Sequence, residues 1–116
     1  DDRFMTRDYR HAYVIGRRDN SAATGFNELV HYDRQTGARK IYTALNKLLG
    51  EPVLAPRQGS TDEADGYILV LAYDQPTALS ELLVFDAQAI EAGPLAVAKI
   101  PLRIPAGFHG SWVAAH

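Results

Sequence analysis

Histidine is the residue type in this sequence best suited to binding a metal ion. The 116 residues include no cysteine, so a transition metal would have to be held by imidazole nitrogen or carboxylate oxygen. Histidines stand at positions 11, 31, 109 and 116, and no two of them have the His-x-x-x-His spacing that places two ligands on one helix face. A metal site would therefore need ligands from separate segments of the chain.

His109 has the sequence context of a ligand in a crowded site. It follows Pro105-Ala106-Gly107-Phe108 and precedes Gly110, so the backbone on both sides can approach neighbouring groups closely. The aromatic residues Phe108 and Trp112 indicate a buried surrounding. A histidine that is hydrogen-bonded within an ordinary core has the same context, and spacing alone does not separate these two interpretations.

Glu51 is the second candidate. It stands between Gly50 and Pro52 at the start of an apolar segment, where burial of an unpaired carboxylate is unfavourable. A buried carboxylate commonly has a positive or hydrogen-bond-donating partner, and accepting the far N–H of a metal-bound imidazole is one such use. The alternative is an exposed glutamate at the beginning of a strand.

We interpret the other histidines and the acidic loop as structural. His11 is expected to be packed or hydrogen-bonded at a sheet surface, and His31 to be a solvated residue at a strand end. His116 is the last residue and carries no information. A solvated loop is expected to hold the acidic residues Asp62, Glu63 and Asp65.

Short apolar or alternating segments, separated by turn residues, predict an all-β protein. The expected strands cover residues 9–16, 26–32, 38–43, 67–73, 80–86, 95–104 and 108–114. A hairpin turn is expected at 33–37, where Asp33 can start the turn and Gly37 can adopt a positive φ.

The connecting segments are predicted in the same way. Polar residues predict loops at 17–25 and 57–66, and only 44–50 has helical character. Residues 51–56 are expected to be extended, because the prolines disfavour helix at the residue before each of them.

This pattern fits either a small β-sandwich or some of the blades of a larger β-propeller. At about 40–50 residues per blade, the chain is long enough for two to three blades. The sequence opens with Asp1-Asp2-Arg3-Phe4, without methionine, and soon becomes apolar. We therefore expect a piece cut or processed from a longer chain.

The composition excludes several classes of function. A net charge of −2 provides no basic surface for nucleic acid. No apolar run approaches the ~20 residues of a transmembrane helix, and no signal peptide opens the sequence. We expect a cytoplasmic protein and leave open a peripheral association with a membrane.

Four segments of the sequence occur in an order that identifies a family. They are EPVLAPR at 51–57, DGYIL at 65–69, SELLVFDA at 80–87 and GFHGSWV at 107–113. This succession closely resembles the C-terminal end of the carotenoid oxygenase family. That family includes carotenoid and apocarotenoid cleavage dioxygenases, lignostilbene dioxygenases and the retinal pigment epithelium isomerase. DRF at 2–4 and YRHAY at 9–13 resemble the segment that enters the last blades, so nearly all of the chain is covered.

The resemblance implies a fold and a metal site. Residues 1–116 would be the C-terminal part of the propeller domain, forming the last two to three blades of a seven-bladed β-propeller. A non-haem Fe(II) would lie on the propeller axis, bound by four histidines, some of them hydrogen-bonded to glutamates. His109 matches the ligand in the family's Phe-His-Gly segment, and Glu51 matches a glutamate that orients a ligand histidine. Phe108 and Trp112 would be wall residues near the site, whereas His11 and His31 match no ligand position.

The implied reaction uses O₂ to cleave a carbon–carbon double bond into two carbonyl products. Its substrate would be a small hydrophobic alkene of the carotenoid, apocarotenoid or stilbene type. The other three ligand histidines are not in this sequence, so we expect the chain alone to be inactive. Glu51 would then orient a histidine supplied by the missing part.

The alternative function is that of a non-catalytic β-module. Open sheet edges would let such a module associate with itself or with a partner protein. An upstream reading frame encoding three more histidines on strand-like segments favours the enzyme; a gene that starts at Asp1 favours the module.

Overall fold

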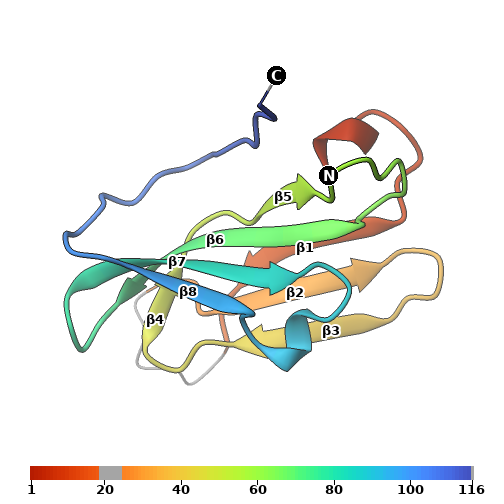
Figure 1. The fold of residues 1–116 in the computed structure, drawn as a ribbon. Coiled ribbons are helices and arrows are strands. Elements are labelled where there is room, and N and C mark those ends of the chain that lie inside the picture. The colour runs from red at the N-terminus through yellow and green to blue at the C-terminus, as the bar shows by residue number, and fades with distance from the viewer. Residues whose placement is uncertain (19–24, 116) are drawn as a thin grey trace.

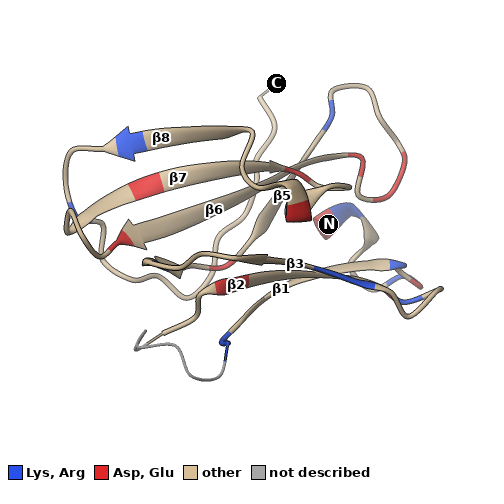
Figure 2. Cartoon of the chain, turned by 90° about the horizontal axis from the view of Figure 1, so that it is seen from below, with Lys and Arg blue, Asp and Glu red and all other residues tan. Residues whose placement is uncertain are grey.

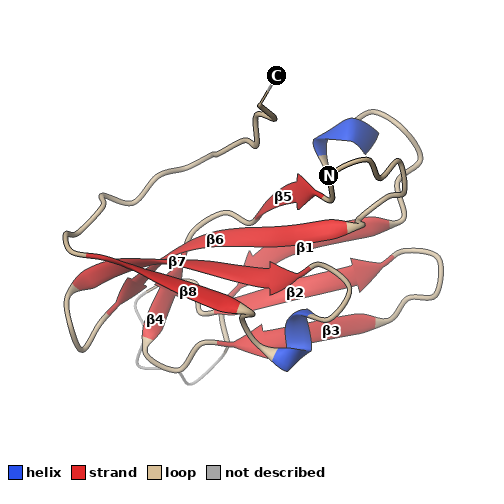
Figure 3. Ribbon diagram, in the orientation of Figure 1, coloured by secondary structure: helices blue, strands red, loops and turns tan. Residues whose placement is uncertain are grey.

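The computed structural model describes residues 1–18 and 25–115, which are built from β-strands (Figure 1). The strands are β1 (His11–Gly16), β2 (Glu28–Asp33), β3 (Arg39–Thr43), β4 (Lys47–Leu49), β5 (Val53–Pro56), β6 (Gly66–Asp74), β7 (Leu79–Asp86) and β8 (Ala96–Ile100). Two 3-10 helices, η1 (Asp2–Phe4) and η2 (Ile90–Ala92), are the only helical elements in these residues (Figure 3). None of them has the length and hydrophobicity that a transmembrane span requires.

The strands form two antiparallel sheets, which confirms the predicted all-β class. Sheet A has the order β1-β2-β3. Sheet B has the order β4-β6-β7-β8, and β5 pairs with β6 beyond the end of β4. Seen from below, the two sheets lie as two layers (Figure 2).

The core lies between the two layers. Along β6, residues 66, 68, 70, 72 and 74 are buried and the intervening residues are half-buried, so one face of this strand meets sheet A. The largest buried apolar side chains are Leu29, Ile68, Val70, Leu83, Phe85 and Ile90. Burying each of them contributes about 1.5–3 kcal/mol. Tyr42 of sheet A meets Phe85 of sheet B edge-on, with ring centroids 5.0 Å apart.

The predicted hairpin turn between β2 and β3 is confirmed. The Asp33 carboxylate accepts hydrogen bonds from the N–H groups of Gln35, at 3.0 Å, and Thr36, at 3.3 Å. Gly37 has a φ of 75°, which a residue with a side chain adopts only with strain. The extended segment predicted at 51–56 contains β5. The predicted loop at 17–25 falls mostly on residues 19–24, which lie outside the described residues, as does His116.

Three predicted elements differ from the structure. Residues 44–50 are not helical, because Lys47–Leu49 pairs with β6 as strand β4, and this pairing outweighs a weak local preference. The strand predicted at 95–104 is shorter, since β8 ends at Ile100 and Pro101 has no N–H for the ladder. Residues 108–114 form no strand.

A buried ion cluster joins three strands at one end of sheet B. Lys47 Nζ lies 2.9 Å from Asp74 Oδ1 and 2.6 Å from Glu81 Oε2. Both acidic residues are buried, Asp74 at the end of β6 and Glu81 on β7. The Thr77 hydroxyl, and then Lys47, hold the pKa of the Asp74 carboxyl below its usual range. The ammonium group therefore compensates two carboxylates that water barely reaches.

His31 is buried between the sheets, so its prediction as a solvated residue is wrong. Its ring stacks on Tyr13 with centroids 4.5 Å apart, and its Nε2 lies 2.9 Å from His11 Nδ1. His31 Nδ1 has no hydrogen-bond partner among the described residues. An unpaired lone pair is less unfavourable than an unpaired N–H, so we assign the shared proton to His31 Nε2. His11 is hydrogen-bonded at the sheet surface, as predicted.

Replacing Lys47 with methionine should destabilise the protein by about 2–3 kcal/mol, because two buried carboxylates would lose their counter-charge. Urea denaturation measures this change in the free energy of unfolding. Lys99→Met, at an exposed lysine on β8, is the matched control and should stay within about 0.5 kcal/mol of wild type. Equal effects of the two substitutions would show that the cluster does not stabilise the fold.

Acid should destabilise the protein through His31. Burial, with smaller effects from His11 and Lys40, lowers the pKa of His31 to about 4, while Asp33 and Glu91 oppose this shift. The unfolded chain takes up the proton near pH 6.5, as an ordinary histidine does. The contribution of neutral His31 to the free energy of unfolding is therefore fully present above about pH 6.5. It falls as the pH is lowered toward 4, by at most about 1.4 kcal/mol per pH unit.

Urea denaturation between pH 7.5 and 4.5 tests this linkage. His31→Phe keeps an aromatic ring beside Tyr13 and removes the titrating group. The variant should lose less stability than wild type over this range. An identical pH dependence in the two proteins would contradict the assignment to His31.

Candidate functional site

A β-bulge in sheet B positions Glu51. Leu49 of β4 pairs with Ala72, and Val53 of β5 pairs with Leu69. The three residues 50–52 therefore stand opposite only two residues of β6, 70 and 71. An extra residue of this kind bends the strand and redirects a side chain, and such bulges are frequent beside active sites.

The residues on either side of Glu51 explain why the bulge forms there. Gly50 donates its N–H to the carbonyl of Leu71 at 2.8 Å, and a Cβ at position 50 would lie 3.1 Å from that oxygen. Pro52 has no N–H to donate to the ladder. The Glu51 side chain is 39% exposed, so it is directed away from the core.

The C-terminal residues 101–115, which we call the strap, complete the site. The strap leaves the end of β8 and runs back past sheet B as irregular chain toward the side where β5 lies (Figure 1). Part of it, with Val53, Leu69, Leu71 and Leu82 of sheet B, lines a cavity of about 250 Å³. His109 and Trp112 belong to this strap wall.

Glu51 holds the strap at His109. Its Oε1 lies 3.2 Å from His109 Nδ1, and its Oε2 accepts the Gly110 N–H at 2.8 Å. The Gly110 N–H, and then the His109 imidazole, hold the pKa of the Glu51 carboxyl below its usual range. An ionised carboxylate only accepts hydrogen bonds, so His109 Nδ1 carries the proton and Nε2 keeps a free lone pair.

The surroundings of His109 differ from those predicted. Its side chain is 88% exposed, and Phe108 is 91% exposed, so the predicted burial around this pair is not found within this chain. The described residues therefore do not make His109 a core histidine. Trp112 is 46% exposed and lines the cavity under the strap. Exposure leaves Nε2 of His109 accessible to a group outside these residues.

The partner of Glu51 also differs from the prediction. Glu51 was expected to orient a histidine from another part of a longer chain, and the structure pairs it with His109. His11 and His31 form a separate pair on β1 and β2. Within residues 1–18 and 25–115, no three His, Asp or Glu side chains come together as a metal site. His109 is therefore a single exposed imidazole whose Nδ1 is held by Glu51.

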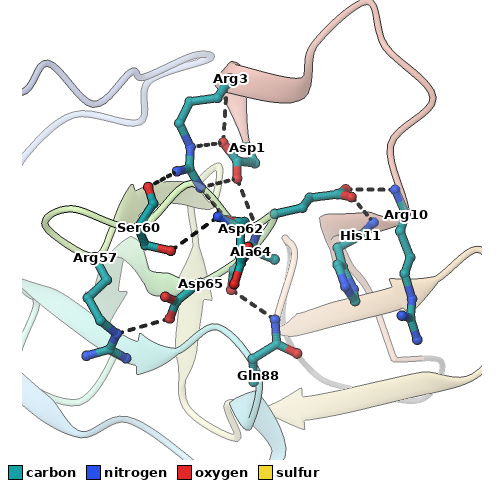
Figure 4. Close-up of polar contacts among 11 residues, drawn as sticks. Asp1, Arg3, Arg10, His11, Arg57, Ser60, Asp62, Ala64, Asp65 and Gln88 are labelled. Atoms are coloured by element: carbon teal, nitrogen blue, oxygen red, sulfur yellow. Dashed lines mark hydrogen bonds and ion pairs between the residues drawn. The ribbon is translucent and has the colours of Figure 1, made fainter.

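The acidic loop between β5 and β6, predicted to be solvated, makes several hydrogen bonds with residues near the N-terminus. Glu63 accepts the backbone N–H groups of Arg10 and His11 at 2.7 and 2.8 Å. The Arg3 guanidinium donates to the carbonyls of Ser60 and Asp62 (Figure 4). These contacts join residues more than 50 positions apart in the chain, so local sequence carried no signal of them.

Comparison with known proteins identifies the family. Residues 1–114 match the protein-family model described as retinal pigment epithelial membrane protein. The chain belongs to this family, the carotenoid oxygenases. This carotenoid oxygenase chain is 36% identical to resveratrol cleavage oxygenase 1 of Aspergillus fumigatus, over 97% of its own length and 25% of the relative.

Solved structures support the same assignment. The lignostilbene dioxygenase of Pseudomonas brassicacearum has a TM-score of 0.90 and 30% identity, covering 99% of this chain and 26% of that one. The cobalt-substituted apocarotenoid oxygenase of Synechocystis has a TM-score of 0.85 and 32% identity, covering 94% and 23%. This carotenoid oxygenase chain thus spans about a quarter of the length of these relatives, and its sheets correspond to part of their β-propeller.

Replacing Glu51 with alanine should change which ring nitrogen of neutral His109 carries the proton. The carboxylate stabilises the form with the proton on Nδ1, so the Nε2–H form should increase when the carboxylate is lost. Nitrogen-15 NMR of the imidazole distinguishes the two tautomers. Glu91→Ala, at an exposed glutamate of η2, is the control. Unchanged tautomer populations in Glu51→Ala would contradict the assigned hydrogen bond.

Proposed function

We propose that this chain supplies one histidine ligand, His109, to the non-haem Fe(II) centre of a dioxygenase. The observation that carries the proposal is the Glu51 contact, which occupies Nδ1 and leaves Nε2 of an exposed imidazole free. A histidine that binds a metal through one nitrogen and donates from the other to a carboxylate is a recurrent arrangement. The cobalt-substituted structure of the Synechocystis relative supports a metal cofactor.

Each residue has a defined part in the proposed site. His109 Nε2 would bind the metal, while Glu51 would fix the ring orientation and increase the basicity of the imidazole. The Gly110 N–H, held by the same carboxylate, would keep the backbone in place. Trp112 and Phe108 would contribute apolar surface near the centre. Bound Fe(II) would supply the activation of O₂ for oxidative cleavage of an alkene.

The substrate class is proposed from the relatives. Their names specify the cleavage of resveratrol, lignostilbene and apocarotenoid compounds. We propose a small hydrophobic alkene of the carotenoid, apocarotenoid or stilbene type, with O₂ as co-substrate. A cytoplasmic location, with or without peripheral contact with a membrane, is consistent with such a substrate.

The active form is proposed to be a longer polypeptide. One imidazole is too few ligands for a useful iron site, and three further histidines would come from segments outside these 116 residues. The 116-residue chain alone is therefore expected to be inactive. Upstream coding sequence with three histidines on strand-like segments would support this view.

A second candidate is self-association through open sheet edges. Strand β8 is an edge of sheet B, and four of its five residues are exposed. Val97 of β8 is 46% exposed and the preceding Leu95 is 63% exposed. Unpaired N–H and C=O groups beside apolar side chains favour pairing with another strand.

Substituting His109 with alanine in the longer polypeptide should reduce iron affinity and alkene cleavage by at least about a hundredfold, because a direct ligand is lost. Metal analysis and an alkene-cleavage assay measure the two effects. His11→Ala removes an imidazole from β1 and should retain iron. Full iron content and full activity in His109→Ala would overturn the ligand assignment.

Sedimentation velocity at increasing concentration tests self-association of the 116-residue chain. The wild type should form dimers or larger species, and Val97→Lys should weaken this association by about tenfold, because a charged edge opposes strand pairing. Val113→Lys, at an exposed strap residue, is the control. A wild type that remains monomeric at high concentration would rule out this candidate.

A further inference from the structure

Ser80 on β7 connects sheet B to the strap through two hydrogen bonds. Its N–H donates to the Leu102 carbonyl at 3.0 Å, and its hydroxyl oxygen accepts the Ile104 N–H at 2.8 Å. Ser80 is only 1% exposed. The hydroxyl satisfies the Ile104 N–H where the strap begins, and alanine at this position would leave that N–H without its acceptor.

The same end of the strap packs over Ser80's neighbours. Ser80 pairs with Tyr73 on β6 and with Ile100 on β8, so these three residues form one row across the sheet. The Arg103 guanidinium carbon lies 4.9 Å from the centroid of the Tyr73 ring. The turn at residues 102–104 therefore folds over this row, with Ser80 at its centre.

The strap is thus fixed at two places, by Ser80 near its start and by Glu51 at His109. Ser80 is on β7, two strands across the sheet from the bulge that carries Glu51. Its partner on β6 is Tyr73, which is two to three residues along that strand from residues 70 and 71, opposite the bulge. With strands about 4.8 Å apart and residues about 3.3 Å apart, the two anchors are separated by roughly 12 Å.

The link between the two anchors is short. Four residues separate Ile104 from His109, and the five Cα–Cα steps between them reach at most about 17 Å when fully extended. Pro105 restricts the link further by fixing its own φ. Loss of the Ser80 contact therefore lengthens the unanchored segment and widens the range of positions open to His109 and Gly110, which disfavours their contacts with Glu51.

We propose that Ser80 is a positioning residue for His109: its hydroxyl fixes the start of the strap, and this holds His109 and Gly110 against Glu51. Its importance for catalysis rests on the proposed function. The geometric effect does not, because it concerns only contacts between residues of this chain.

The experiment follows His109 and Gly110 by NMR in the 116-residue chain. Nitrogen-15 NMR of the imidazole gives the tautomer of His109, and amide hydrogen exchange reports on the Gly110 N–H. In Ser80→Ala the Nε2–H form of His109 should increase, since the Glu51 carboxylate is less often in contact with Nδ1. Exchange at Gly110 should accelerate by about fivefold, as for the loss of one hydrogen bond.

Two further variants separate positioning from general stability. Ser80→Thr keeps the hydroxyl and should restore both values. Thr77→Ala, in the same β6–β7 hairpin, removes a hydroxyl that donates to Asp74 at 2.7 Å and should change neither value. Ile104→Pro removes the donated N–H from the strap side and should reproduce Ser80→Ala, which keeps the test decisive if Ser80→Ala does not fold.

Wild-type values of both the His109 tautomer population and Gly110 exchange in a folded Ser80→Ala or Ile104→Pro protein would overturn the proposal, even if stability were reduced. This outcome would leave the proposed function untouched. Conversely, an unchanged iron content in His109→Ala would remove the catalytic meaning of Ser80 and leave its effect on Glu51 intact.

Discussion

The carboxylate of Glu51 is the contact on which the arrangement of the site depends. It accepts from two groups of the strap, the His109 ring and the Gly110 backbone, and it belongs to a β-bulge that sheet B itself enforces. One oxygen therefore sets the orientation of the imidazole while the other sets the path of the chain. Because the strap has no strand pairing near His109, no backbone ladder could replace this contact.

The fold provides a rigid platform for that contact. Buried apolar side chains from both sheets fix β6, the strand against which the bulge forms. The Lys47 cluster joins the ends of β4, β6 and β7, and so stabilises the end of sheet B that lies beside the bulge. Ser80, next to Glu81 on β7, connects this well-packed part of the sheet to the strap by accepting the Ile104 N–H. The exposed imidazole is thus supported by elements that are themselves well packed.

Much of the fold could be predicted from the sequence, because strand alternation and turn chemistry are local. The Asp33–Gly37 turn and the strand predicted at 67–73, which is β6, are examples. The errors arose where distant partners decide the outcome. Lys47–Leu49 becomes a strand through its pairing with β6, and His31 is buried by the packing of sheet A against sheet B. Neither effect leaves a mark in the neighbouring residues.

The candidate site shows the same division. The types of Glu51 and His109 and their sequence contexts identified both residues, and the family motifs increased the weight of that choice. Their contact could not be predicted, since 58 positions separate them and the strap is irregular. An aromatic residue beside histidine suggests burial, so the exposure of Phe108 could not be predicted. Among the described residues, none covers its ring.

The central claim is that His109 presents a free Nε2 to a metal while Glu51 holds Nδ1. A crystal structure of the longer polypeptide, with anomalous scattering recorded at the iron absorption edge, tests it most directly. The account predicts an iron peak at bonding distance, about 2.1 Å, from His109 Nε2, with Glu51 still on Nδ1. An iron peak remote from His109, or bound through Nδ1, would contradict it.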